Sequence, residues 1–289
     1  MALCNGIETN LDQIRRLLIT GSGGRLGRLL RAAAGLCGRD GPDVIFQSRK
    51  PDADICWSPG DPFEKLPDCD MVVALWGRTD GDERALSENS DLARLSRDVA
   101  HHCGARHVVH MSSAAVYGPG EDFTEDAPLA PVTAYGAAKS QMERKLLETA
   151  RADGPRDIIL RLANVVGADS LAPALKGKSP VVLDRFEDGL GPHRSYLAPG
   201  DLFQVLLHLA QAEDEAVPGV LNVASVASVG MEDLARAAGK EIVWRPAPDT
   251  AVQNVTLDIS KLIAAFPDMQ RQQTAADLIA DWRALEAMR

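Results

Sequence analysis

Short apolar runs alternate with longer amphipathic stretches through the first 167 residues of this 289-residue chain. Several runs are almost continuously apolar, as expected for strands of a parallel sheet that helices cover on both faces. The stretches between them carry Leu and Ala at helical spacing. The predicted strands are Leu17–Thr20, Val44–Gln47, Ile55–Trp57, Met71–Leu75, His107–Met111 and Ile158–Leu162, and the predicted helices are Arg25–Leu36, Asp91–His102 and Ala134–Ala152.

The pattern changes after Gly167, where four prolines between positions 173 and 199 predict a loop-rich segment with few elements. We expect this segment to shape a cleft. The elements predicted beyond it are a helix at Asp201–Gln211, a strand at Val220–Val223, and helices at Met231–Ala238 and Thr274–Met288. The alternation of strands and helices predicts an α/β fold with a doubly wound parallel sheet of the Rossmann type.

Composition narrows the function classes. Lys and Arg total 31 against 41 Asp and Glu, a net charge of −10, which disfavours nucleic acid and anionic membrane surfaces as partners. The longest apolar runs are of strand length, well below the roughly 18 residues of a spanning helix. The first sixteen residues lack a signal-peptide pattern, and five cysteines without C-x-x-C spacing fit a reducing cytoplasm, so we predict a cytoplasmic location.

A glycine-rich turn joins the first predicted strand to the first predicted helix. Gly21, Gly24 and Gly27 form a G-x-x-G-x-x-G pattern that lets backbone amides approach a pyrophosphate and places the anion at a helix N-terminus. The alternative is a glycine-rich turn without a ligand, but the flanking strand and helix favour a dinucleotide site. The predicted cofactor-binding residues of this turn are Gly21, Ser22, Gly23, Gly24, Arg25, Leu26 and Gly27.

The end of the second strand indicates which dinucleotide is bound. NAD enzymes usually carry an acidic residue there to bind the ribose hydroxyls, whereas this chain has Gln47-Ser48-Arg49-Lys50. Arg49 can pair with a 2′-phosphate, which an Asp would repel. We therefore predict that Ser48 and Arg49 contribute to a site that prefers NADP(H) over NAD(H). The alternative is that the two cations are solvated turn residues.

Tyr135 and Lys139 are four residues apart at the start of a predicted helix, so they share one face. A nearby ammonium stabilises a phenolate, and a tyrosine acting as a base at neutral pH needs help of up to about 4 kcal/mol. The pair therefore predicts proton transfer at a bound dinucleotide. The alternative is an exposed i,i+4 pair on a helix that only packs.

These motifs together resemble the extended short-chain dehydrogenase/reductase family, its NAD-dependent epimerase/dehydratase group. The resemblance covers most of the chain in order and rests on Thr20-Gly21-x-x-Gly24-x-x-Gly27, Ser113-Ala-Ala-Val-Tyr117-Gly118, Glu125-Asp126-Ala-Pro128, Tyr135-x-x-x-Lys139, Arg161-Leu-Ala-Asn164-Val-Val-Gly167 and Asn222. It implies that Tyr135 is the catalytic acid/base, that Lys139 holds the nicotinamide ribose and lowers the pKa of Tyr135, that Ser113 binds the reacting oxygen, and that Asn164 faces the substrate.

The chain departs from the family pattern at several positions. Ala114 and Ala115 stand where the similar sugar-nucleotide dehydratases carry an Asp-Glu pair, so dehydratase chemistry is disfavoured. Ser195 replaces the usual Asp, and the segment before it is short, which puts a full nucleotide-sugar pocket in doubt. Leu75 and Trp76, predicted to bind the cofactor, replace the small residues usual after the fourth strand, and we expect them to alter the floor of the nicotinamide site.

Three further residues are predicted to contact the substrate: Tyr117, Arg194 and Tyr196. Arg194 with Tyr196 either binds a phosphate or carboxylate of the substrate or braces a surface loop, and the sequence leaves both open. The cluster His101, His102, Cys103 and His107 suggests metal ligands, but it lacks the spacing of structural zinc sites, and we predict no metal.

We assign residues 1–167 to a dinucleotide-binding Rossmann core, with 199–224 returning to it, and 168–198 and 225–289 to a small substrate-binding part. The expected function is hydride transfer between NADP(H) and a carbinol or keto carbon of a sugar or sugar-nucleotide-like molecule, by a reductase or an epimerase. The rival is a binding protein of the same fold that senses NADP(H) without turnover. By analogy with the family, the helices Asp91–His102 and Ala134–Ala152 predict a homodimer.

Overall fold

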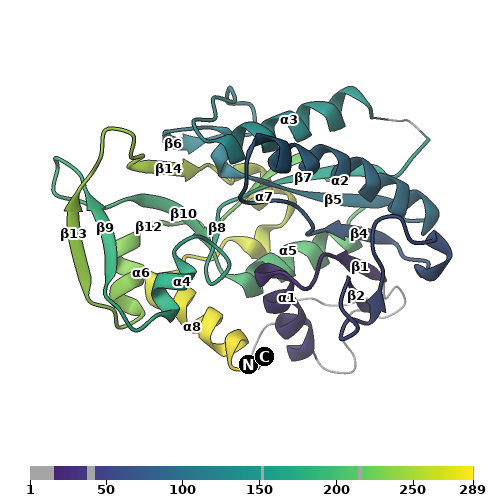
Figure 1. Ribbon diagram of the computed structural model, residues 1–289, viewed down its shortest axis with the longest axis horizontal. Coiled ribbons are helices and arrows are strands. Elements are labelled where there is room, and N and C mark those ends of the chain that lie inside the picture. Colours follow the sequence, from purple (N-terminus) through teal and green to yellow (C-terminus); the bar gives the residue numbers. More distant parts are fainter. Residues whose placement is uncertain (1–15, 38–42, 151–152, 214–216, 289) are drawn as a thin grey trace.

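The computed structural model describes residues 16–37, 43–150, 153–213 and 217–288. Its larger sheet has seven parallel strands in the order β11-β7-β5-β4-β1-β2-β3 (Figure 1). The predicted doubly wound α/β fold is confirmed. The strands of this sheet are β1 (Leu17–Thr20), β2 (Val44–Ser48), β3 (Ile55–Cys56), β4 (Met71–Ala74), β5 (His107–Ser113), β7 (Arg156–Leu162) and β11 (Val220–Val223).

The apolar runs become the centre of this sheet because their side chains are buried on both faces. All residues of β1 and β4 are buried, and the two strands pair in register from Leu17 with Met71 to Thr20 with Ala74. The strand order reverses between β1 and β4, so the chain leaves their carboxyl ends in opposite directions and opens a crevice between them. Doubly wound folds bind their ligands in this crevice, at the carboxyl ends of the strands.

Helices cover both faces of the larger sheet (Figure 1). On one face α2 packs against α3, and on the other α1 packs against α5 and α8. The bounds of these helices are α1 (Arg25–Leu36), α2 (Glu83–His102), α3 (Ala134–Glu148), α5 (Pro199–Gln211) and α8 (Ala275–Glu286). The predicted start of α2 at Asp91 was eight residues late, because Asp82 caps the helix by accepting a hydrogen bond from the Ala85 amide at 2.8 Å.

The loop-rich segment predicted after Gly167 contains one short helix and two strands between residues 168 and 198, and these strands pair with strands from elsewhere in the chain. A five-stranded sheet has the order β12-β10-β14-β6, with β8 paired to β10, and β9 and β13 form a two-stranded sheet. The remaining elements are β6 (Gly120–Phe123), β8 (Asn164–Val165), α4 (Ala172–Lys176), β9 (Val181–Arg185), β10 (His193–Leu197), β12 (Ser228–Gly230), α6 (Met231–Ala237), β13 (Ile242–Pro246), β14 (Asn254–Leu257) and α7 (Ser260–Ala265).

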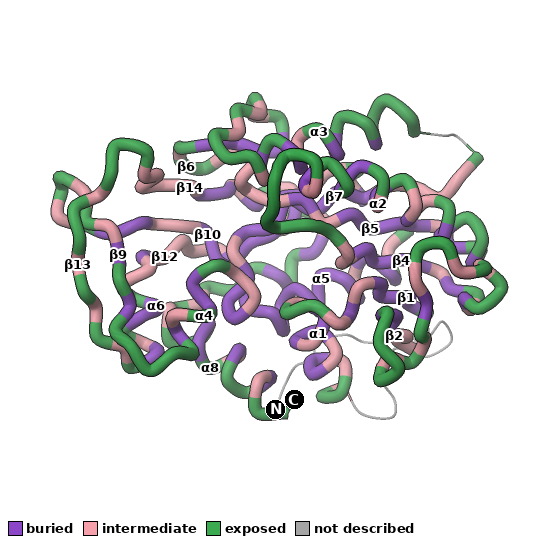
Figure 2. The backbone as a smooth tube through the Cα atoms, viewed as in Figure 1, coloured by how far each residue is buried: buried purple, intermediate pink, exposed green. Residues whose placement is uncertain are grey.

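One hydrophobic cluster joins the two parts of the chain. It includes Leu17 of β1, Phe203 of α5, Leu257 of β14 and Trp282 of α8. Buried backbone accordingly continues from the larger sheet into the smaller one (Figure 2). The smaller sheet is therefore held firmly against the carboxyl edge of the larger one. In the part of the chain that the structure describes, no helix is both long and apolar enough to span a bilayer.

Candidate active site

The glycine turn between β1 and α1 touches the segment that follows β4. Gly21 has φ +70°, and a Cβ there would lie 2.5 Å from the backbone nitrogen of Trp76. A Cβ at Gly27 would lie 2.5 Å from the Ser22 Cα, so only glycine lets α1 begin this close to the turn. The two glycines therefore bring the N-terminus of α1 and the end of β4 together, as a pyrophosphate site requires.

Side-chain contacts fix the turn. The Gly21 amide donates to Oε1 of Gln47 at 3.0 Å, and the Ser22 hydroxyl donates to the Gln47 carbonyl at 2.9 Å. Arg25 donates to the carbonyl of Asp169 at 3.0 Å, and Leu26 packs against the core. These side chains therefore hold the turn in place, and the cofactor binding predicted for Ser22, Arg25 and Leu26 stays a prediction.

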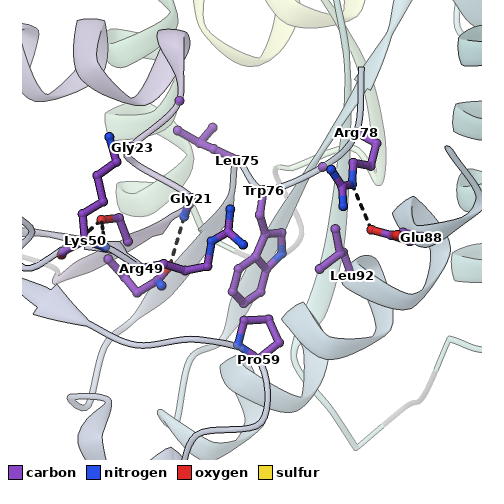
Figure 3. A pocket seen from close by; sticks show the side chains of 14 residues that line it. Gly21, Gly23, Arg49, Lys50, Pro59, Leu75, Trp76, Arg78, Glu88 and Leu92 are labelled. Atoms are coloured by element: carbon purple, nitrogen blue, oxygen red, sulfur yellow. Dashed lines mark hydrogen bonds and ion pairs between the residues drawn. The ribbon is translucent and has the colours of Figure 1, made fainter. Parts of the chain in front are cut away.

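A cavity of about 510 Å³ opens beside this turn (Figure 3). Its volume is in the range of small-molecule sites. The predicted cofactor residues Gly21, Gly23, Gly24, Ser48, Arg49, Leu75 and Trp76 line it, together with Gln47, Lys50, Pro59, Gly77, Arg78, Glu88 and Leu92.

Glu88 was missed because the sequence pattern started α2 at Asp91, so that Glu88 fell outside the predicted helix. The cap residue Asp82 is the signal that would have found the earlier start.

Cations dominate the rim of the cavity near β2. Arg49 and Lys50 are exposed, and Figure 3 shows Arg49 extending toward Trp76 and Lys50 toward Gly23. Buried Ser48 shapes their backbone, since its hydroxyl accepts a hydrogen bond from the Lys50 amide at 3.0 Å. Glu88, the acid in the lining, is neutralised by Arg78 at 2.9 Å. The cavity therefore fits a dinucleotide, with a glycine turn for the pyrophosphate and two cations where a ribose phosphate would lie.

Ser113, Tyr135 and Lys139 lie near one another at the carboxyl end of β5. Thr133 starts α3 by accepting a hydrogen bond from the Gly136 amide at 3.0 Å, which sets Tyr135 in the first turn. The Lys139 ammonium lies 6.0 Å from the centre of the Tyr135 ring and donates to the Met111 carbonyl at 2.7 Å. A Cβ at Gly77, which lines the cavity, would lie 3.6 Å from the Lys139 Nζ. The proton-transfer residues therefore adjoin the cavity.

Burial controls the acidity of these groups. It raises the pKa of Tyr135, and the hydrogen bond with Ser113 opposes this rise. It lowers the pKa of Lys139 to about 8, while Glu143 acts in the opposite direction. The Lys139 ammonium is directed toward the Met111 carbonyl, and the expected lowering of the Tyr135 pKa by Lys139 stays a prediction.

Tyr117 does not face the cleft, which corrects its predicted role as a substrate contact. It is 2% exposed, its hydroxyl donates to Oδ1 of Asn222 at 2.7 Å, and it accepts from Arg161 at 2.8 Å. Arg161 also pairs with buried Glu143 at 2.8 Å. This network ties β5, β7, β11 and α3 together beneath the site.

The other residues predicted to contact the substrate are Arg194, Tyr196 and Asn164. Arg194 donates to the carbonyls of Val252 at 2.6 Å and of Gln253, contacts that fit a brace, and its contact with a substrate stays a prediction. Tyr196 is fully buried in the core, so its predicted substrate contact is also corrected. Asn164 is half-buried at the start of β8, and its role toward a substrate stays a prediction.

The residues considered as metal ligands are separated by the fold. His101 and His102 end α2, where the helix dipole favours them, while His107 begins β5 and is buried. Within residues 16–37, 43–150, 153–213 and 217–288, no group of three or more His, Cys, Asp or Glu residues is placed to hold a metal ion.

Comparison with known proteins adds an independent finding. The model described as the NAD dependent epimerase/dehydratase family matches residues 17–224. A dTDP-6-deoxy-L-talose 4-dehydrogenase (NAD(P)(+)) from Kitasatospora kifunensis is 30% identical over 269 residues, covering 81% of this chain and 83% of that protein. A UDP-glucose 4-epimerase from Azospirillum brasilense is 47% identical over 68 residues, 23% of this chain and 20% of that protein.

Solved structures share the fold at lower identity. MoeE5 in complex with UDP-glucuronic acid and NAD has a TM-score of 0.77 and 19% identity, covering 94% of this chain and 99% of that one. TunA, an NAD dependent NDP-hexosamine 5,6-dehydratase, has a TM-score of 0.72 and 20% identity, covering 94% and 98%.

Proposed function

Because this chain belongs to the NAD dependent epimerase/dehydratase family, we propose that it moves a hydride between a nicotinamide dinucleotide and a carbinol or keto carbon of a sugar nucleotide. The observation that carries the proposal is the meeting of Ser113, Tyr135 and Lys139 beside the glycine-lined cavity. A binding protein needs the cavity, but it has no use for a proton donor beside it.

The chain's own residues supply the proton path. The glycine turn would hold the dinucleotide, whose nicotinamide would supply the acceptor or donor of the hydride. Tyr135 takes the proton from the substrate hydroxyl or returns it to the carbonyl oxygen, and Ser113 hydrogen-bonds Tyr135 and holds that oxygen. Lys139 contributes the positive charge that stabilises the phenolate once its ammonium turns from the Met111 carbonyl toward Tyr135.

Dehydration is not part of the proposal. Elimination of water needs an acid and a base beside the reacting carbons, and the residues after Ser113 are Ala114 and Ala115. The family includes dehydratases, and TunA shares the fold, so this exclusion rests on the two alanines alone. A net reductase or dehydrogenase is favoured over an epimerase, in agreement with the name of the Kitasatospora relative.

The cofactor we propose is NADP(H) in preference to NAD(H). Support comes from Arg49 and Lys50 at the rim of the cavity and from Ser48 in place of an acid at the end of β2. The MoeE5 structure holds NAD, and its 19% identity to this chain carries only the fold.

We further propose that cofactor binding and substrate binding belong to the two parts of the chain expected from the sequence. Residues 1–167 with 199–224 hold the cofactor, while 168–198 and 225–289 bind the substrate. The proposed assembly is a cytoplasmic homodimer built through α2 and α3, which lie side by side on one face of the larger sheet (Figure 1).

The test is hydride transfer with a panel of UDP- and dTDP-activated sugars and their 4-keto forms, followed at 340 nm with NADPH and NADH. We expect turnover with NADPH on at least one member and a loss of at least about a hundredfold in kcat for Tyr135→Phe, since general acid–base catalysis contributes about 10²–10⁴. The phenylalanine variant keeps the ring and is expected to bind the cofactor as the native protein does.

An epimerase would interconvert two sugars without net consumption of cofactor, and chromatography of the products separates this outcome from reduction. Stoichiometric dinucleotide binding without transfer to any panel member, unchanged by Tyr135→Phe, would overturn the enzymatic proposal in favour of a sensor.

A further inference from the structure

The Trp76 indole lies on the side of the cavity that β2 and β3 form. The sequence placed it under the nicotinamide, but its ring packs against Trp57 and lies near Pro59 and Arg49, on the β2 and β3 side (Figure 3). Gly77 adjoins Lys139 at the reacting end of the site, whereas the Trp76 ring is directed toward Trp57.

The indole is held rigidly. Its Nε1 donates to the Ser96 hydroxyl at 2.8 Å, and that hydroxyl in turn donates to the Leu92 carbonyl at 2.7 Å. Ser96 is fully buried, so both hydrogen bonds are shielded from water. A half-buried ring fixed in this way loses little rotamer freedom when a ligand packs on it.

Trp76 also ends a column of aromatic rings. Phe63 stacks on Trp57 with ring centres 5.8 Å apart and an angle of 18°, and Trp57 contacts Trp76 at 5.9 Å and 37°. Beyond Trp76 the column meets the cavity, because the residue is part of its lining. A planar base placed there would continue the column, and offset stacking is the geometry that aromatic rings favour.

Trp76 adjoins the glycine turn through its backbone. The Trp76 backbone nitrogen lies 2.5 Å from the position that a Cβ at Gly21 would take, so the indole begins directly beside the pyrophosphate turn. Arg49 extends toward the ring from β2, as Figure 3 shows, and its guanidinium can lie at the ribose phosphate or over the base.

We propose that the Trp76 indole is the platform on which the adenine of the dinucleotide stacks, so that this residue sets adenine affinity independently of the 2′-phosphate. The inference rests on the proposed function, because it assumes that the cavity holds a dinucleotide. Base–aromatic stacking of this kind predicts a loss of about 5- to 150-fold in affinity when the ring is removed.

The experiment measures binding of 5′-AMP, adenosine 2′,5′-bisphosphate and NADP⁺ by calorimetry to the native protein, Trp76→Ala and Trp76→Phe. We expect Trp76→Ala to weaken the two adenosine fragments by the same factor, because both carry the same base. Trp76→Phe keeps an aromatic ring and should bind within about threefold of the native protein. Binding should also quench native tryptophan emission, and this quenching should be lost in Trp76→Phe but kept in the control Trp244→Phe, whose indole lies on β13.

Equal or tighter binding of the fragments by Trp76→Ala would show that the indole only narrows the cavity, and this overturns the inference. A loss confined to the bisphosphate, or a loss in Trp76→Phe as large as in Trp76→Ala, overturns it as well. If the native protein binds none of the three ligands, the proposed function itself fails. A preference for NAD⁺ over NADP⁺ leaves the stacking result intact, so the two failures are distinguishable.

Discussion

Lys139 keeps an ammonium group where water hardly reaches it. Burial lowers its pKa from the ordinary value of 10.5 to about 8, which corresponds to about 3 kcal/mol of unfavourable burial of the charge. Nearby Glu143 acts in the opposite direction, and the pKa of about 8 already includes its effect, while the ammonium donates to the Met111 carbonyl. A side chain that packs without chemistry would be apolar here, so the retained ammonium at a 5% exposed position favours a catalytic purpose over a packing one.

A substitution of Arg49 tests the predicted preference for NADP(H) over NAD(H). Arg49→Ala should weaken NADPH binding by about 10- to 150-fold, because it removes a charge-assisted pairing with the 2′-phosphate, while NADH binding should change less than about threefold. Equilibrium titration of NADPH fluorescence measures both constants. Arg84→Ala, an exposed arginine of α2 outside the cavity, is the matched control. Equal losses for the two cofactors would refute the NADP(H) preference.

Some strands could be predicted from the sequence, and others could not. The strands β1 and β4 were predictable because every residue in them is buried on both faces. The strand β6 has the sequence Gly-Glu-Asp-Phe and no apolar run, and β8 has two residues, so neither leaves a periodic signal. These strands form through pairing with β14 and β10, which are distant along the chain.

The candidate site was likewise predictable only where its residues form a local sequence pattern. The glycine turn and the Tyr135–Lys139 pair are local patterns, and the structure places them as the spacing predicts. Tyr117 was misassigned because its hydroxyl bonds to Asn222, 105 positions later, and local sequence cannot show such a partner. A tyrosine next to a motif is therefore weak evidence for substrate contact until its burial is known.

Two glycines of helix α1, Gly27 and Gly35, differ in the space that an added side chain would have. A Cβ at Gly27 would meet the Ser22 backbone at 2.5 Å, whereas nothing lies within 4 Å of a Cβ at Gly35. Gly27→Ala should lower the free energy of unfolding by about 1–3 kcal/mol and weaken dinucleotide binding, because α1 must move away from the turn. Gly35→Ala should raise it by about 0.5–1 kcal/mol and leave binding unchanged. Urea denaturation and NADPH titration check both, and equal effects would contradict the steric role of Gly27.

At the scale of the whole molecule, the contact between α5 and α8 holds the C-terminal helix on the larger sheet. Two carboxyl groups meet there: Asp201 in the first turn of α5, 6% exposed, and Asp281 of α8, which accepts a hydrogen bond from the Gly200 amide at 3.1 Å. Arg271 lies 3.9 Å from Asp201 and only partly compensates. Burial and then the neighbouring Asp281 raise the pKa of Asp201 to about 6, and burial raises the pKa of Asp281 as well.

This contact predicts a pH dependence of stability with a definite sign. Because the pKa of Asp201 is higher in the folded chain than its ordinary value of 3.8, the folded state binds the proton more tightly than the unfolded state does. The stability that this group contributes is therefore complete below about pH 3.8 and is lost as the pH rises through about 6. Asp201→Asn stays neutral throughout, so it should match the native protein at pH 4 and exceed it at pH 8 by up to about 3 kcal/mol.

Urea denaturation from pH 4 to pH 8 measures this difference directly. Asp249→Asn, which alters an exposed acid in the loop after β13, is the control, and its stability should follow that of the native protein at every pH. Taking the difference between variant and native protein removes the contribution of groups whose pKa is shifted in the opposite direction, such as Asp157. Burial is the largest influence on the pKa of Asp157 and acts to raise it, but hydrogen bonds from His110 and Arg97 outweigh burial, so the pKa is lowered. A variant that is destabilised equally at pH 4 and pH 8 would mean that Asp201 acts through its hydrogen bonds and that the contact between α5 and α8 does not respond to pH.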